Sequence, residues 1–369
     1  MKKVLTVILI FALCLTLVVG LVACNKDCKE HVDENGDYVC DNCEESLPNN
    51  NEQNGDDDSN SNAGDNAEDN EDNDITVEAV PKAEYTSEKV GDVTYVYYGT
   101  LPLSAVTQEN NLHSVLVNLI ESSQLTPNAS GYYVHNDKEY ACIRGTEDNE
   151  GIRLSNGLTM EEDKLYVFNV EKIKWRVLEE KEGRSVLLCE NIIAEHHFNP
   201  AGSYSVNLGT LIGTPNNAND YSVSALRTYV NETLLNEIFT VREKQSIFDT
   251  NVILRPGESA FMLTQGMYAT TVNKMYIPSY WEINEKYDLK QGESKVPVAE
   301  VPDYQLASGF NASTNGTRYY ASWWLRTSGE HINEGNVVNY DGTIGTDSSC
   351  SVNLSETIGI RPMITLRTA

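Results

Sequence analysis

Apolar residues recur at regular spacings from about Val80 to the C-terminus, and these spacings predict a folded domain. Residues 93–101 (VTYVYYGTL) are rich in β-branched and aromatic side chains, which predicts a strand. Apolar residues three and four positions apart predict two helices, one within residues 110–123 and one from Ser222, as the N-cap, to about Phe239. The two apolar stripes consist of Leu112, Val115, Leu116, Leu119 and Ile120, and of Leu226, Val230, Leu234 and Ile238.

Short strands joined by tight turns account for much of the remaining pattern. We expect residues 131–143 to form a β-hairpin. In residues 173–177 (IKWRV) apolar and charged side chains alternate, which is typical of a half-buried strand. A turn at residues 182–183 then leads into an apolar strand at 185–190. Near the C-terminus the segments WWLRT, NVVNY and IGIRPMITL predict further strands.

Residues 1–23 have the composition of a signal peptide. Lys2 and Lys3 precede an apolar run that ends in LVAC, and this ending resembles the bacterial lipobox. The resemblance implies cleavage before Cys24, lipid on its thiol, and a protein anchored in the cell membrane at its extracytoplasmic face. An uncleaved transmembrane anchor is the alternative, because eighteen mostly apolar residues approach the length that spans a bilayer.

Residues 24–44 contain a compact set of metal-binding side chains. Cys28, His31, Cys40 and Cys43 are spaced C-x2-H-x8-C-x2-C, and paired short spacings allow four ligands to close on one tetrahedral ion. The pattern resembles a small module of bacterial surface proteins. A module of this length cannot bury a core, so a structural zinc ion would supply its folding free energy, roughly 10–16 kcal/mol in zinc-finger peptides.

Two other interpretations of this module remain open. Disulfides are common outside the cell, although three local cysteines would leave one unpaired. A calcium loop is the third interpretation, although its sixth position, which needs glycine, holds Tyr38. The oxygen ligands of that loop would be Asp33, Asn35, Asp37, Asp41 and Glu44.

Negative charge is concentrated between this module and the domain. The chain of 369 residues has a formal net charge of −28, and residues 44–74 hold twelve Asp or Glu and no Lys or Arg. Such a charge disfavours nucleic acid and anionic lipid surfaces as partners. Residues 45–79 are almost devoid of apolar side chains and are expected to form a disordered linker that gives the domain, residues 80–369, reach from the membrane.

Five segments of the domain resemble, in the same order, the motifs of an uncharacterised family of bacterial extracytoplasmic domains. They read VYYGTLPLSAV, EKIKWRVLEEKEGRSVLLCENIIAEHHFN, YSVSALRTYVNETLLNEIF, SWWLRTSG and IGIRPMITL. The family's corresponding motifs are of the type FGxYPQ, IxWxVL, SxLRxWLN, WWLRS and GVRPAL. The family is similar in turn to the C-type-lectin-like fold of formylglycine-generating and sulfatase-modifying proteins. This resemblance implies an α+β domain of two helices and short, twisted antiparallel strands with long loops.

The segment YYASWWLRTSG has two interpretations. On a strand, Trp323 and Trp324 point to opposite faces, so at most one indole can lie on a binding surface. The family resemblance favours a core tryptophan with Arg326 in a structural ion pair or hydrogen bond. The alternative is a ligand groove, for which the candidate binding residues are Trp324, Arg326, Tyr320 and Tyr204.

The sequence shows no known catalytic motif. His196 and His197 are adjacent, so in an extended chain they cannot readily hold one metal ion, and we name no catalytic residue. A non-catalytic recognition domain for glycan or protein ligands at the cell surface is the favoured function. An enzyme acting on the cell wall, related to sulfatase-modifying proteins, and a purely structural display protein are the alternatives. The expected cofactor is structural zinc alone.

Overall fold

The structure is a computed structural model that describes residues 81–200, 219–253, 270–289, 295–328, 334–344, 349–351 and 357–369. The described residues belong to one unit, Thr76–Ala369. The signal peptide, the Cys/His module and the acidic linker lie outside the described residues. The predicted site residues Cys24, Cys28, His31, Cys40 and Cys43 therefore also lie outside the described residues. Tyr204 of the domain lies outside them as well.

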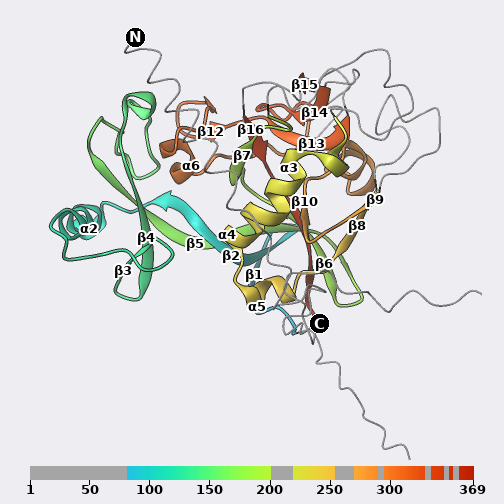
Figure 1. Ribbon diagram of the computed structural model, residues 1–369, viewed down its shortest axis with the longest axis horizontal. Helices are drawn as coiled ribbons and strands as arrows, with labels where there is room; N and C mark the ends of the chain where they lie inside the picture. The colour runs from blue at the N-terminus through green and yellow to red at the C-terminus, as the bar shows by residue number, and fades with distance from the viewer. Residues whose placement is uncertain are drawn as a thin grey trace, which may run out of the picture. The chain divides into compact units, whose positions relative to one another are not determined.

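An antiparallel sheet of eight strands runs through the described part of the domain (Figure 1). The strand order is β1-β2-β5-β6-β17-β10, and the hairpin β3-β4 is attached to β5. The bounds are β1 Thr86–Val90, β2 Val93–Ala105, β3 Tyr133–His135, β4 Lys138–Arg144, β5 Leu165–Lys181, β6 Arg184–Cys189, β10 Met275–Tyr276 and β17 Met363–Arg367. Strands β2 and β5 are long and lie side by side, with register shifts that mark bulges.

Two turns of this sheet have positive φ at both central residues. Asn136 and Asp137, between β3 and β4, have φ of 51° and 60°. Glu182 and Gly183, between β5 and β6, have φ of 51° and 75°. Two-residue hairpin turns that match the twist of the strands need positive φ at both central positions. The predicted hairpin and the predicted pair of strands are therefore confirmed.

A second sheet of five strands has the order β15-β14-β13-β16-β7 among the described residues. The bounds are β7 Ala194–His196, β13 Trp323–Ser328, β14 Glu334–Val338, β15 Ser349–Ser351 and β16 Ile358–Ile360. Two small sheets pair β8 (Thr250–Ile253) with β9 (Thr270–Asn273) and β11 (Ser313–Thr314) with β12 (Tyr319–Tyr320). The segment IGIRPMITL is divided between sheets, because the chain leaves β16 at Arg361-Pro362 and enters β17 of the first sheet.

Both predicted helices form. The first is α2 (Leu112–Glu121), which follows the short turn η1 (Glu109–Asn111). The second continues through three segments, α3 (Ala225–Thr228), the π-helical η4 (Tyr229–Leu234) and α4 (Leu235–Ile238). Its N-cap is Ser224, whose hydroxyl accepts a hydrogen bond from the backbone N–H of Arg227 at 3.1 Å, and not the predicted Ser222.

The remaining helical segments are short. They are η2 (Glu147–Asn149), η3 (Tyr221–Val223), α5 (Val241–Gln245), η6 (Glu282–Lys286) and α6 (Asp303–Ala307). In the described ranges no helix has the length and apolar character needed to cross a membrane.

The two larger sheets and the second helix share a main core. Trp175 of β5 and Ile364 of β17 pack in one cluster with Leu226 and Val230 of the helix, which lies against strands of both sheets (Figure 1). This helix buries all four residues of its predicted apolar stripe. The stripe therefore supplies the hydrophobic contact that holds the two sheets together.

The two adjacent tryptophans fill different cores. Trp324 belongs to the main core, whereas Trp323 belongs to a second core together with residues of β6, η6 and α6. Each indole is 1% exposed. This confirms the prediction, made from the strand period, that the two side chains point to opposite faces. The WW pair thus joins the two cores through one strand.

The predicted fold class, an α+β domain of C-type-lectin-like architecture, is wrong. The two helices are present, but the described part consists mainly of antiparallel sheet, built on the long strands β2 and β5 instead of short strands wrapped around helices. Helix α2 packs in a small separate cluster with Tyr140 and Val167. Local patterns located the elements correctly, whereas the architecture depends on long-range strand pairing that they do not encode.

Candidate functional site

The arginine of the WWLRT segment is a buried structural cation. The side chain of Arg326 is 3% exposed and forms an ion pair with Glu282 at 2.5 Å. The guanidinium also donates to the backbone carbonyl of Ile277 at 3.0 Å. The same Glu282 carboxylate accepts from the backbone N–H of Ser279 at 2.9 Å. This pair ties β13 to the start of η6, which agrees with the structural interpretation of the segment.

The arginine of the GIRP segment is still more deeply buried. The side chain of Arg361 is 1% exposed, and its pKa is lowered to about 10 by burial. Its guanidinium donates to the carbonyls of Cys189 at 2.7 Å and Pro297 at 3.2 Å and lies 3.5 Å from the Glu190 carboxylate. It also lies over the Trp323 ring, 5.2 Å from the ring centroid. The guanidinium therefore remains charged at neutral pH and links three segments.

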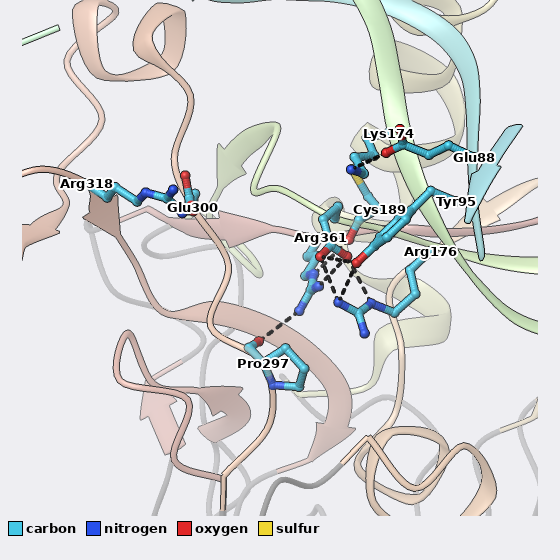
Figure 2. Close-up of polar contacts among 10 residues, drawn as sticks. Glu88, Tyr95, Lys174, Arg176, Cys189, Pro297, Glu300, Arg318 and Arg361 are labelled. Atoms are coloured by element: carbon cyan, nitrogen blue, oxygen red, sulfur yellow. Dashed lines mark hydrogen bonds and ion pairs between the residues drawn. The ribbon is translucent and has the colours of Figure 1, made fainter. Parts of the chain in front are cut away.

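A second arginine shares this carboxylate. Arg176 of β5 donates from two nitrogens to Glu190, at 3.0 and 2.7 Å. Figure 2 shows Arg176, Arg361 and Tyr95 converging on one point. Burial alone would raise the pKa of Glu190, but the hydrogen bond and charge of Arg176, with the charge of Arg361, outweigh burial and hold it below its ordinary value. We call the three charged residues Glu190, Arg176 and Arg361 the Glu190 network.

The network extends outward through a more exposed pair. Lys174 lies 4.0 Å above the Tyr95 ring and forms an ion pair with Glu88 at 2.7 Å (Figure 2). The Tyr97 hydroxyl donates to the same Glu88 carboxylate at 2.6 Å. Each of these cations contacts a carboxylate, and Arg176 and Arg361 share that of Glu190. The arrangement therefore explains the packing of β1, β2, β5 and β6.

A candidate binding site lies elsewhere, beside the small sheet β11–β12. A larger hollow of about 370 Å³ is lined by Phe310, Asn311, Ala312, Ser313, Ala321, Ser322, Tyr340, Thr357, Ile358 and Gly359. A smaller hollow of about 300 Å³ is lined by Val298, Ser313, Thr314, Asn315, Tyr320, Tyr340 and Asp341. Because Ser313 and Tyr340 line both, the two hollows adjoin, and together we call them the tyrosine groove.

Paired strands hold the groove in place. Strand β12 pairs with β11 and is bridged on its other side between Tyr320 and Glu300. Strand β16, which supplies Ile358 and Gly359, lies between β13 and β7 in the second sheet. Strands β12 and β16 are therefore paired on both sides, and such a scaffold positions side chains at low entropic cost.

Aromatic and hydroxyl groups dominate the exposed chemistry of the groove. Tyr340 is 52% exposed, and Tyr320 is half-buried with Asn315 donating to its hydroxyl at 3.4 Å. The hydroxyl of Thr357, at the other end, donates to the Glu195 carboxylate at 2.7 Å. Tyrosine rings with nearby hydroxyl and amide groups offer both flat apolar contact and directional hydrogen bonds.

One carboxylate lines the groove in the described part of the chain. Asp341 accepts from the Thr343 hydroxyl at 2.7 Å and from its backbone N–H at 3.0 Å, and pairs with Lys295 at 3.4 Å. Hydrogen bonds from Thr343, and then the charge of Lys295, hold the pKa of Asp341 below its ordinary value. Asp341 is thus ionised at neutral pH and oriented by its own turn.

The four candidate binding residues of the sequence do not form one site. Trp324 is buried, and its indole N–H donates to the carbonyl of His196 at 3.0 Å. Arg326 is buried in its ion pair, and Tyr204 lies outside the described residues. Of the four, only Tyr320 is placed by the structure in the groove. Tyr340 was missed because it ends the segment NVVNY, which was predicted as a strand, whereas the structure ends β14 at Val338 and places Tyr340 in the turn that follows.

His196 and two cysteines of the described residues have structural surroundings. The His196 ring stacks on Tyr229 with centroids 4.4 Å apart, and burial lowers the His196 pKa. Cys142 and Cys189 are free thiols, and burial raises the pKa of Cys189 to about 12. Within the described ranges, no group of three or more metal-binding side chains comes together.

Comparison with known proteins gives one family. The model of a domain of unknown function, DUF6273, matches residues 183–368, from the start of β6 through β17. The match includes both tryptophans, both buried arginines and the tyrosine groove. No curated protein and no solved structure gives a significant match.

Proposed function

The chain belongs to the DUF6273 domain family, and we propose that it is a membrane-anchored lipoprotein whose domain, residues 80–369, recognises a ligand outside the cell through the tyrosine groove. One observation carries this proposal. Two tyrosine rings and a set of hydroxyl and amide side chains line two adjoining hollows on a doubly paired strand scaffold. Loops displayed on such a scaffold are typical of binding sites.

The chemistry of the groove supports binding without reaction. Its one lining carboxylate in the described residues, Asp341, is held by Thr343 and Lys295, which leaves it poorly placed to donate or accept a proton in a reaction. We therefore propose a recognition role and assign no catalytic residue.

The N-terminal sequence supports the cellular setting of this role. Lipid on Cys24 would hold the chain at the extracytoplasmic face of the membrane, and the acidic segment 45–79 would let the domain search a volume around its anchor. The module at 24–44 would be a zinc-stabilised base for that tether, with Cys28, His31, Cys40 and Cys43 as its ligands. A binding domain benefits from such reach.

Retention on surface material tests the proposal. The full-length protein in detergent is incubated with cell-wall and secreted-protein fractions of its host, and the bound fraction is measured. The test variant is Tyr340→Ala, and the control is Val241→Ala, which removes an apolar side chain that is 71% exposed on α5. We expect the control to be retained and Tyr340→Ala to be lost.

Three results would contradict the proposal. Equal retention of the two variants would show that the groove is not the binding site. Absence of retention on every fraction would favour a display protein. Release of a soluble product from any fraction by the unmodified protein would show that the domain is an enzyme.

A further inference from the structure

The charges of the tyrosine groove limit what it can hold. Among the described residues that line it, Asp341 is ionised and no lining residue is cationic. The nearby cations Lys295 and Arg318 are paired with Asp341 and Glu300 respectively. In a chain of formal net charge −28, this arrangement repels phosphate, sulfate and carboxylate groups. The ligand of the groove is therefore not an anion.

The hydrogen-bonding groups of the groove suit a polyhydroxyl ligand. The larger hollow is lined by Ser313, Ser322, Thr357 and Asn311, and the smaller by Asn315 and Tyr320. Of these groups, the Thr357 hydroxyl already donates to Glu195 and the Asn315 amide to the Tyr320 hydroxyl. Hydroxyls both donate and accept, and amides carry one acceptor and two donors. A ligand that offers many hydroxyls of its own can satisfy such a mixed set without leaving a charge unpaired.

The exposed tyrosine at the shared wall adds an apolar surface. Tyr340 lines both hollows and is 52% exposed, so a flat ligand can lie against its ring. Sugar rings combine an apolar face of C–H groups with an equatorial rim of hydroxyls. This combination matches a tyrosine ring surrounded by hydroxyl and amide side chains.

Two of the three strands that line the groove, β12 and β16, are closed to an extended peptide. A peptide bound by strand addition needs an edge with free N–H and C=O groups. In the groove, β12 pairs with β11 and is bridged to Glu300, and β16 lies between β13 and β7. The backbone N–H of Gly359 donates to the carbonyl of Ser322 at 3.1 Å. These two strands therefore offer no free edge to a peptide.

We infer that the ligand of the tyrosine groove is an uncharged carbohydrate chain, with neighbouring sugar units in the two hollows and Tyr340 between them. The inference rests on the proposed function and narrows it to one chemical class. The two adjoining hollows, of about 370 and 300 Å³, are each within the size range of a small-ligand site, so each has room for one unit of a chain.

Selective destruction of the surface material tests the class of ligand. The cell-wall and secreted-protein fractions are each divided into three parts. One part is oxidised with periodate, which cleaves vicinal diols of sugars. The second part is digested with protease, and the third is left untreated. Binding isotherms are measured for the full-length protein and for Tyr340→Ala and Tyr340→Phe. Phenylalanine keeps the ring and loses the hydroxyl, so it separates stacking from hydrogen bonding.

We expect periodate to abolish binding, Tyr340→Ala to weaken it about tenfold, and Tyr340→Phe to retain most of the affinity. Binding that survives periodate, disappears after protease and still depends on Tyr340 would overturn the carbohydrate inference and leave the proposed function standing. Binding that does not depend on Tyr340, or no binding at all, would overturn both. An equal loss for Tyr340→Phe and Tyr340→Ala would overturn the stacking arrangement.

Discussion

The Glu190 network gives a prediction that can be worked through in detail. Glu190→Gln keeps the size of the side chain and removes the charge that faces two guanidinium groups. The side chains of Arg361 and Arg176 are 1% and 14% exposed, so neither can turn fully into solvent. Glutamine also brings an NH2 donor into a site where the surrounding groups are donors.

The magnitude follows from the burial of the pair. Removing one partner of a fully buried ion pair costs about 3–5 kcal/mol, because the other charge remains desolvated. The Glu190 side chain is 23% exposed, and solvent screening reduces the value. We therefore expect Glu190→Gln to lower the free energy of unfolding by about 2–4 kcal/mol.

The pH dependence has a definite sign. The folded-state pKa of Glu190 lies below its ordinary value, so its contribution to stability is complete above the ordinary range of glutamate. That contribution is lost as the pH falls through the folded-state pKa. The Glu190→Gln variant should therefore lose less stability on acidification than the unmodified protein does.

The assay is equilibrium denaturation of the full chain in guanidinium chloride, followed by tryptophan fluorescence. All four tryptophans of the chain lie in the domain, and three of them, Trp175, Trp323 and Trp324, are buried. The control is Glu88→Gln, which removes a carboxylate from the more exposed pair with Lys174 and should have a much smaller effect. Equal effects of the two substitutions, or an unchanged acid dependence in Glu190→Gln, would refute the reasoning.

Three further predictions concern the backbone and the N-terminus. Gly99→Ala should destabilise the domain by about 2–5 kcal/mol in the same denaturation assay, because Gly99 has φ of +68° and an added Cβ would lie 2.6 Å from side-chain atoms at the end of α4. The control is Gly91→Ala, where φ is +62° but no atom lies near the added Cβ, and it should cost only about 1–2 kcal/mol. Cys24→Ser should leave an uncleaved precursor in cell fractionation, and unchanged, cleaved mobility in the membrane fraction would contradict lipid attachment. The reduced peptide 25–46 should show one zinc adduct by native mass spectrometry, and equal zinc binding by its Cys40→Ser, Cys43→Ser variant would exclude the proposed ligand set.

The sequence predicted those features of the fold that depend on neighbouring residues. The alternation in residues 173–177 located β5, and the strand period placed Trp323 and Trp324 on opposite faces. The four-residue spacing of the second helix marked its buried stripe, although η4 is π-helical within it. Each of these signals arises from the geometry of a single strand or helix.

Contacts between distant segments could not be predicted in this way. Arg361 and Glu190 are 171 positions apart, and neither residue carries a local mark that identifies its partner. The tyrosine groove could not be predicted for the same reason, since Tyr320, Tyr340 and Thr357 come together only through the order of the strands. The wrong fold class also reflects this limit, because two correctly located helices are compatible with many sheet arrangements.

Hydrogen exchange is the measurement that tests the central claim most directly. The full-length protein is exchanged alone and with polymer solubilised from the fraction that retains it, and peptides are followed by mass spectrometry. We predict slower exchange in residues 311–322 and 339–343, which carry the tyrosine groove, and little change in β1 and β2. Protection confined to β1 and β2, or identical exchange with and without the polymer, would contradict recognition through the groove.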